Sequence, residues 1–148
     1  MPDRETLERA REDAREGKSP STQAGEFVRE EIHHIREGKH GARSTQQAIA
    51  IGLSEARRAG VKLSPPKGPA AVRKKAAQDA AAGRKTKGSM RKVSAKRSRA
   101  TEAALKRESR SAASHEALSR QAKKSAIKRG KQARRQAAVK ATRTRKAA

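Results

Sequence analysis

Cysteine, tryptophan and tyrosine are absent from this chain of 148 residues, and Phe27 is its only phenylalanine. Without cysteine, the chain can form no disulfide bond, no thiolate nucleophile and no cysteine-based zinc site. Proteins that read single-stranded RNA, and many that bind single-stranded DNA, stack bases on aromatic side chains. The near absence of aromatics therefore disfavours both functions and leaves the binding of a duplex through charge and shape.

Long apolar runs are also missing, so the sequence predicts no membrane span. The first 16 residues, MPDRETLERAREDARE, are rich in acidic side chains and contain no apolar segment, which argues against a secretory signal or a mitochondrial presequence. A helix on a membrane surface would need large apolar side chains opposite its lysines, where this chain has mostly alanine. We therefore expect a cytoplasmic protein with no membrane partner.

The charge and the larger apolar side chains are divided between the two halves of the chain. The formal net charge is +24, yet residues 1–66 carry 12 basic and 11 acidic side chains, whereas residues 67–148 carry 27 basic and 4 acidic ones. The first half also holds most of the apolar side chains larger than alanine. A core is therefore expected in the first half, and an arm that binds a polyanion in the second.

Start and stop signals predict three helices in the first half. A charged helix over residues 3–16 ends at Gly17, and a second helix runs from Pro20, behind the cap Ser19, to residue 37 before Gly38.

The third helix begins after Ser44, which forms a capping box with Gln47. It ends at Gly60, with Val61 as the apolar contact of a Schellman motif. Within it, Gly52 permits a close approach of another helix.

The second and third helices are expected to pack on each other, because the loop between them is short. Ile49 and Ile51 lie on nearly opposite sides of the third helix, so this helix needs cover on two sides, from the first helix or from a second copy of the chain. The sequence therefore predicts a possible homodimer through the N-terminal helices. The candidate self-association residues are Phe27, Val28, Ile32, Ile35, Ile49, Ile51 and Leu53.

The chain is predicted to be all-α and to have four segments. These are a charged N-terminal helix (1–17), a helical hairpin module (18–64), a basic linker rich in Pro, Gly and Ala (65–89), and a basic, conditionally helical arm (90–148). The N-terminal fold as a whole is thus expected to be a helical hairpin or a three-helix module. Helical patterns cover residues 70–85 and 94–108 and restart at Ser109 or Ser111. Because these helices have little to bury, we expect the arm to be largely disordered alone and to fold along phosphates.

Clusters of Lys and Arg, spaced by alanine and serine, place cations around a helix without a bulky apolar face. This pattern suits a phosphate backbone and offers little to discriminate bases. The candidate nucleic-acid-binding residues are Arg73, Lys74, Lys75, Arg84, Lys85, Lys87, Arg91, Lys92, Lys96, Arg97, Arg99, Lys106, Arg107, Arg110, Arg120, Lys123, Lys124, Lys128, Arg129, Lys131, Arg134 and Arg135.

The histidine-rich sequence EEIHHIREGKH allows a zinc clip, because Glu30–His34 and His33–Glu37 are spaced by one helical turn. A closed site needs four ligands, and a polar helix face with local pairs is the commoner meaning of this pattern. The sequence therefore predicts no metal and no cofactor.

Catalytic patterns are weak. The EGKSP segment resembles a phosphate-binding P-loop, but it lacks the first glycine of that motif and a preceding strand. No serine sits in a nucleophile elbow, and no carboxylate pair stands out. We therefore predict that the chain is not an enzyme.

Two strings, GKHGARSTQQAIAIGLSEARRAGVKL and SRSAASHEALSRQAKKSA, resemble a family of small, very basic bacterial proteins known as a domain of unknown function. The resemblance covers about residues 18–65, with a second piece near 90–130. It implies a bacterial, intracellular setting and no particular activity. The alanine- and lysine-rich arm is also similar in composition to the tails of linker-histone-like bacterial proteins.

These observations predict a non-enzymatic, nucleoid-associated protein that binds duplex DNA largely independently of sequence. The arm contacts phosphates, and the N-terminal helices mediate self-association. Two alternatives remain open. One is a protein associated with structured RNA or the ribosome, and the other is an adaptor whose helical module binds a protein while its basic tail localises it.

Overall fold

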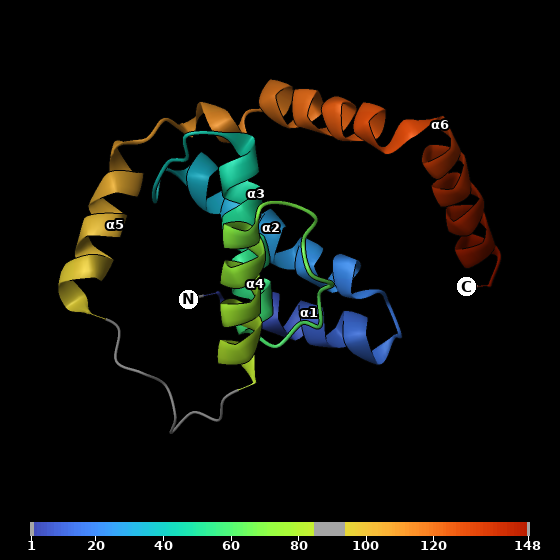
Figure 1. Ribbon diagram of the computed structural model, residues 1–148, viewed down its shortest axis with the longest axis horizontal. Helices are drawn as coiled ribbons and strands as arrows, with labels where there is room; N and C mark the ends of the chain where they lie inside the picture. The colour runs from blue at the N-terminus through green and yellow to red at the C-terminus, as the bar shows by residue number, and fades with distance from the viewer. Residues whose placement is uncertain (1, 85–93, 148) are drawn as a thin grey trace. The chain divides into compact units, whose positions relative to one another are not determined.

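The computed structural model describes residues 2–84 and 94–147, and helices are the only regular secondary structure in these ranges (Figure 1). The chain forms two compact units, residues 1–113 and 114–148. The predicted all-α class is confirmed. None of the helices in the described part combines the length and the apolar character needed to cross a bilayer.

The first two helices have the predicted ends. Helix α1 spans Arg4–Arg15, and α2 spans Pro20–Glu37. Ser19 caps α2, since its Oγ accepts a hydrogen bond from the Thr22 amide at 3.4 Å. Gly38 ends the helix with a φ of 81°, a left-handed conformation that favours glycine.

Helix α3 spans Thr45–Arg58 and begins at the predicted cap. The Ser44 Oγ accepts a hydrogen bond from the Gln47 amide at 3.2 Å. The Gln47 side chain accepts one from the Arg43 amide at 2.8 Å, one residue earlier than a standard capping box requires.

The C-terminal end of α3 is the predicted Schellman motif. Gly60 has a φ of 99°, and its amide donates to the Arg57 carbonyl at 3.1 Å. The Val61 amide donates to the Ala56 carbonyl at 3.0 Å, and this 6→1 hydrogen bond defines the motif.

The core of the first unit lies between α1, α2 and α3. Phe27 is packed with Ala10, Ala24 and Ala56, so the first half of α2 lies against the second half of α3. A Cβ atom built on Gly52 would lie 2.7 Å from the Cα atom of Val28. The predicted close approach at Gly52 is therefore confirmed, and it requires glycine.

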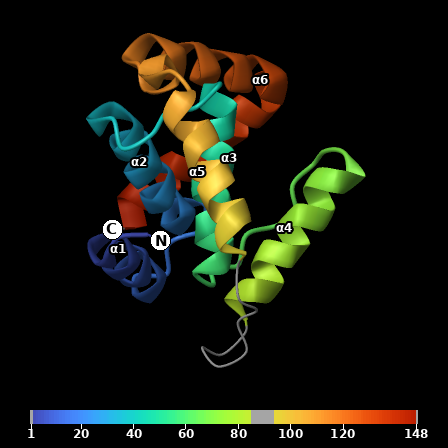
Figure 2. The ribbon, with the colours of Figure 1, turned by 90° about the vertical axis from the view of Figure 1, so that its left-hand side faces the viewer.

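The second side of α3 is covered by α4 (Ala70–Gly83), so that α3 lies between α2 and α4 (Figure 2). The Ser54 Oγ on α3 donates to Asp79 Oδ2 on α4 at 2.7 Å, and Asp79 is only 4% exposed. Cover was expected from the first helix or from a second copy, but a helix within the segment predicted as a linker provides it. With α1 on α2 and α4 on α3, the module is more than a hairpin.

The first unit also includes α5 (Ala95–Arg107) and a short 3-10 helix, η2 (Arg110–Ala113). We call residues 105–113 the docking segment, because they bind the corner between α2 and α3. The Gly41 amide donates to the Leu105 carbonyl at 2.9 Å, and the Thr45 Oγ1 donates to the Ala112 carbonyl at 2.7 Å. The C-terminal end of α5 is thereby tied to the α2–α3 module.

The second unit consists mainly of α6 (His115–Ala147), which is interrupted at Gly130, where φ is 76° and ψ is 166°. The Ser114 Oγ accepts a hydrogen bond from the Ala117 amide at 3.2 Å. The prediction that this helix restarts at Ser109 or Ser111 was wrong, because those residues precede and enter η2 and bond to each other.

The largely disordered arm is not confirmed. Its described residues are mostly helical, although α6 buries no side chain among its described residues. Alanine and the straight-chain Lys, Arg and Gln side chains are strong helix formers, which accounts for the helices in local terms.

Candidate nucleic-acid interface

Every candidate nucleic-acid-binding residue that the structure describes is exposed. They lie on α4, α5, η2 and α6, except for Arg84, which directly follows α4. They are Arg73, Lys74, Lys75, Arg84, Lys96, Arg97, Arg99, Lys106, Arg107, Arg110, Arg120, Lys123, Lys124, Lys128, Arg129, Lys131, Arg134 and Arg135. The other four candidates, Lys85, Lys87, Arg91 and Lys92, lie outside the described residues.

Few of these cations are neutralised by a carboxylate. In the described ranges, three of them form ion pairs: Lys75 with Asp79 at 2.7 Å, Lys106 with Glu102 at 2.8 Å, and Arg120 with Glu116 at 3.3 Å. Each pair links residues one helical turn apart, and such exposed pairs contribute little. Most of the positive charge therefore remains available to an external polyanion.

Helix α6 carries twelve basic side chains and one acidic side chain, Glu116. Its last turns hold four exposed cations that the sequence prediction omitted, Lys140, Arg143, Arg145 and Lys146. The same signal, Lys and Arg within an alanine-rich helix, could have found them.

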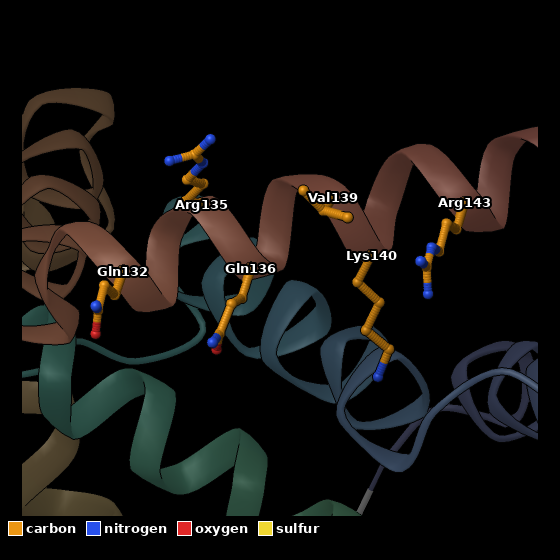
Figure 3. A pocket seen from close by; sticks show the side chains of 6 residues that line it. All are labelled: Gln132, Arg135, Gln136, Val139, Lys140 and Arg143. Carbon is orange, nitrogen blue, oxygen red and sulfur yellow. The ribbon is translucent and has the colours of Figure 1, made fainter.

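Side chains project from more than one side of this helix. Figure 3 shows Arg135 pointing away from Lys140, while Gln136 and Val139 lie between them along the helix. A helix with cations on several sides can meet phosphates of both strands of a duplex, and it presents no rigid face for reading base edges.

The candidate self-association residues are mostly used inside a single chain. Phe27, Ile32 and Ile35 are buried, whereas Val28, Ile49, Ile51 and Leu53 are half-buried. A second copy of the chain could therefore contact only the latter four directly, and self-association stays a prediction.

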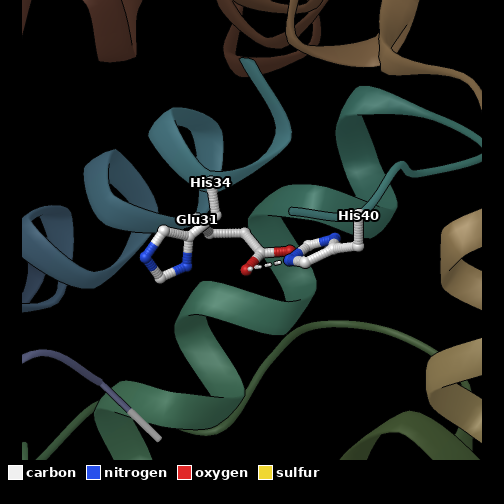
Figure 4. Close-up of side chains that lie close together, drawn as sticks. All are labelled: Glu31, His34 and His40. Atoms are coloured by element: carbon white, nitrogen blue, oxygen red, sulfur yellow. Dashed lines mark ion pairs between the residues drawn. The ribbon is translucent and has the colours of Figure 1, made fainter. Parts of the chain in front are cut away.

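A second group of charged side chains lies at the α2–α3 corner, and we call it the carboxylate–histidine cluster. It comprises Asp3, Glu30, Glu31, His34 and His40. Its two glutamates are 6% and 2% exposed, which is unusual for charged side chains. Figure 4 shows the Glu31 carboxylate between the rings of His34 and His40.

The cluster contains two groups of possible ligand atoms that share His34. The atoms of Glu31, His34 and His40 lie within 4.8 Å of one another, as do those of Asp3, Glu30 and His34. The sequence pattern had paired Glu30 with His34. It missed the Glu31–His40 pair, because that pair forms only when the chain folds back after Gly38.

The pKa of the Glu31 carboxyl is raised to about 7, chiefly by burial and to a smaller extent by the charges of Glu55 and Glu30. The His40 ring opposes this rise. One oxygen of each buried glutamate, Glu30 Oε2 and Glu31 Oε1, has no hydrogen-bond partner among the described residues. Buried carboxylate oxygens usually have a partner, and a proton, a water or an ion would each serve here.

Residues 17–68 match a family of unknown function (DUF6496). The match begins just before α2, contains α2 and α3, and ends before α4, and it covers less than half of the chain. The family resemblance drawn from the sequence is thus confirmed for this region. No curated protein and no solved structure was found to match the chain.

Proposed function

We propose that this protein binds duplex DNA without base specificity through the cations of α4, α5 and α6, and that the α1–α4 helices form the folded module that carries them. The observation that carries the proposal is the row of exposed cations on α6, twelve against one acidic side chain on a helix that buries nothing in the described residues. Such a charge excess is self-repulsive, and the phosphates of a polyanion would relieve it.

We infer that the protein has a nucleoid-associated, non-enzymatic role. The composition supports contact with the phosphate backbone, because Lys and Arg dominate the exposed faces and no aromatic platform accompanies them. Structured RNA offers the same phosphates. Duplex DNA remains the first candidate, and the experiment below distinguishes the two.

A filter-binding titration of the full chain against a 30-base-pair DNA duplex tests the proposal. If about ten phosphates are neutralised, the logarithm of the binding constant should fall with the logarithm of the salt concentration at a slope near −9. A nearly flat slope would contradict the proposal. Unlabelled duplex DNA and duplex RNA of equal length are then compared as competitors. If the RNA competes more strongly than the DNA, the ligand is structured RNA.

A charge-matched pair of variants separates the interface from net charge alone. One variant changes Lys123, Lys124, Lys128, Arg129, Lys131 and Arg134 of α6 to Gln. The control changes six exposed cations of the first half to Gln: Arg4, Arg11, Arg15, Lys18, Lys39 and Lys62. The α6 variant should lose about 5 units of salt slope, and the control should lose little. Equal losses would show that only net charge matters.

A further inference from the structure

The geometry points to a binding site for a divalent transition-metal ion, of the zinc class, formed by Glu31, His34 and His40. The site is independent of the proposed DNA binding and involves none of the cations of α6. The three ligand atoms lie within 4.8 Å of one another, and they come from α2 and from the loop that follows it.

The protonation of His40 is the first argument. Its Nδ1 lies 3.1 Å from the Gly41 carbonyl oxygen, and since a carbonyl oxygen can only accept, this bond needs the proton on Nδ1. In the neutral ring, Nε2 then has a bare lone pair. That atom lies 3.5 Å from Glu31 Oε2, so a proton or a metal ion between the two atoms would keep their lone pairs from facing each other.

The separation of these two atoms is the second argument. A protonated imidazole that donates to a carboxylate would lie about 2.7–2.9 Å from it. The observed 3.5 Å is longer. It fits instead the distance of about 3.4 Å between two ligands that each lie about 2.0–2.1 Å from a tetrahedral ion.

The surroundings of His34 provide the third argument. Its Nε2 lies 3.5 Å from Asp3 Oδ2 and 3.7 Å from Glu30 Oε1. Figure 4 shows the other ring nitrogen turned toward the Glu31 carboxylate. A histidine that binds a metal usually engages a carboxylate or a carbonyl with its second nitrogen. His40 does so through the Gly41 carbonyl, and His34 Nε2 lies near two carboxylates without a hydrogen bond to either.

An unpartnered oxygen completes the site. Glu31 Oε1 has no hydrogen-bond partner among the described residues, although Glu31 is only 2% exposed. A surface depression lined by Asp3, Glu30 and His34 reaches the His34 side of the cluster from outside. Two imidazoles and a carboxylate are the donors that zinc and related ions prefer, and a water would occupy the fourth position.

Titration of Zn²⁺ into the EDTA-treated full chain, followed by calorimetry, tests this site. We expect one equivalent to bind and to raise the melting temperature, because the ion binds only the folded chain. Glu31→Gln and His40→Ala should each weaken binding at least as much as the loss of a supporting group does, about 10–100-fold. His33→Ala is the matched control, since His33 lies exposed on the same helix and pairs with Glu37.

NMR of the histidine ring protons keeps the test decisive if a variant fails to fold. In the wild-type chain, one equivalent of Zn²⁺ should shift the signals of His34 and His40 and leave those of His33 and His115 in place. The site is refuted if Zn²⁺ does not bind, if all four histidines shift alike, or if well-folded His40→Ala and His33→Ala variants bind Zn²⁺ equally. None of these readouts involves nucleic acid, so failure of the zinc site would leave the DNA-binding proposal untouched.

Discussion

Gly52 and Gly41 lie where two stretches of backbone approach too closely for any side chain. At Gly52 an added Cβ atom would meet the Cα atom of Val28 at 2.7 Å, and at Gly41 it would meet the Glu108 carbonyl oxygen at 1.9 Å. Both neighbours are backbone atoms, which cannot move aside as the end of a flexible side chain can. These two positions fix the packing of α3 on α2 and of the docking segment on the α2–α3 corner.

Gly52→Ala should destabilise the protein by about 1–3 kcal/mol, because the added methyl group forces α2 and α3 apart. Gly25→Ala is the matched control. Gly25 also lies within a helix, but an added Cβ atom there would meet nothing within 4 Å, so alanine should stabilise by about 0.5–1 kcal/mol. Urea denaturation followed by circular dichroism measures both, and equal changes would contradict the packing argument.

Thr45 is a buried residue whose hydroxyl holds the docking segment through the Ala112 carbonyl. Thr45→Val keeps the shape and removes the donor, which should cost about 1–3 kcal/mol. Thr101→Val is the control, because Thr101 only bonds back to Arg97 on the exposed helix α5 and should change stability by less than about 0.5 kcal/mol. If thermal melts show no difference between the two variants, the docking bond is not formed.

At the scale of helices, α4 is held on α3 mainly by one polar anchor. Asp79 accepts from Ser54 of α3 and pairs with Lys75 of its own helix, and Ala76 is buried beside it. The rest of α4 is exposed or half-buried. A helix with so little buried apolar area opens more readily than the core helices do.

Asp79→Ala should therefore release α4 while leaving α1, α2 and α3 folded. Amide hydrogen exchange followed by mass spectrometry should show faster exchange over residues 70–83, with little change over residues 20–58. Glu102→Ala provides the control, since Glu102 is exposed and pairs only with Lys106 on its own helix. Uniformly faster exchange across both regions would show that α4 belongs to the same cooperative unit as α3.

At the scale of the whole molecule, stability and charge are separated. Every buried side chain among the described residues belongs to the first unit, residues 1–113. The second unit holds twelve of the 39 basic side chains and only one of the 15 acidic ones. Folding of the first unit is therefore expected to need no contribution from α6, which under the proposed function supplies much of the charge that binds a polyanion.

A fragment of residues 1–113 should melt cooperatively at nearly the temperature of the full chain. Its affinity for a DNA duplex should be lower and its salt slope markedly flatter, because it lacks the cations of α6. Differential scanning calorimetry and filter binding measure the two properties. A fragment that does not fold would show that the second unit stabilises the first, and unchanged DNA affinity would place the interface elsewhere.

The helix ends were predictable because their signals are local. Ser19 with Pro20, Gly38, and the pair Gly60 and Val61 act on backbone atoms within one turn, and each behaves as expected. The start of α6 was missed because three serines, Ser109, Ser111 and Ser114, offer the same local signal. The docking of residues 105–113 on the α2–α3 corner decides between them. Ser109 and Ser111 bond to each other there, and Ser114 caps α6.

The exposure of the candidate nucleic-acid-binding residues could be predicted, because exposed cations need no partner within the chain. The carboxylate–histidine cluster could not. Its pair Glu31 and His40 comes from a helix and the following loop, and the burial that leaves a Glu31 oxygen without a partner depends on how α2 and α3 pack.

By itself, the sequence determined the all-α class, the helix boundaries of the first half and the concentration of positive charge in the second, since propensity, capping and net charge act over a few residues. Tertiary structure alone decided that α4 covers α3, that residues 105–113 bind the α2–α3 corner, and that two histidines enclose a buried glutamate. Each of these depends on contacts between residues distant in sequence or across a turn, and the free energy of such contacts comes from the burial and hydrogen bonding that only the folded chain provides.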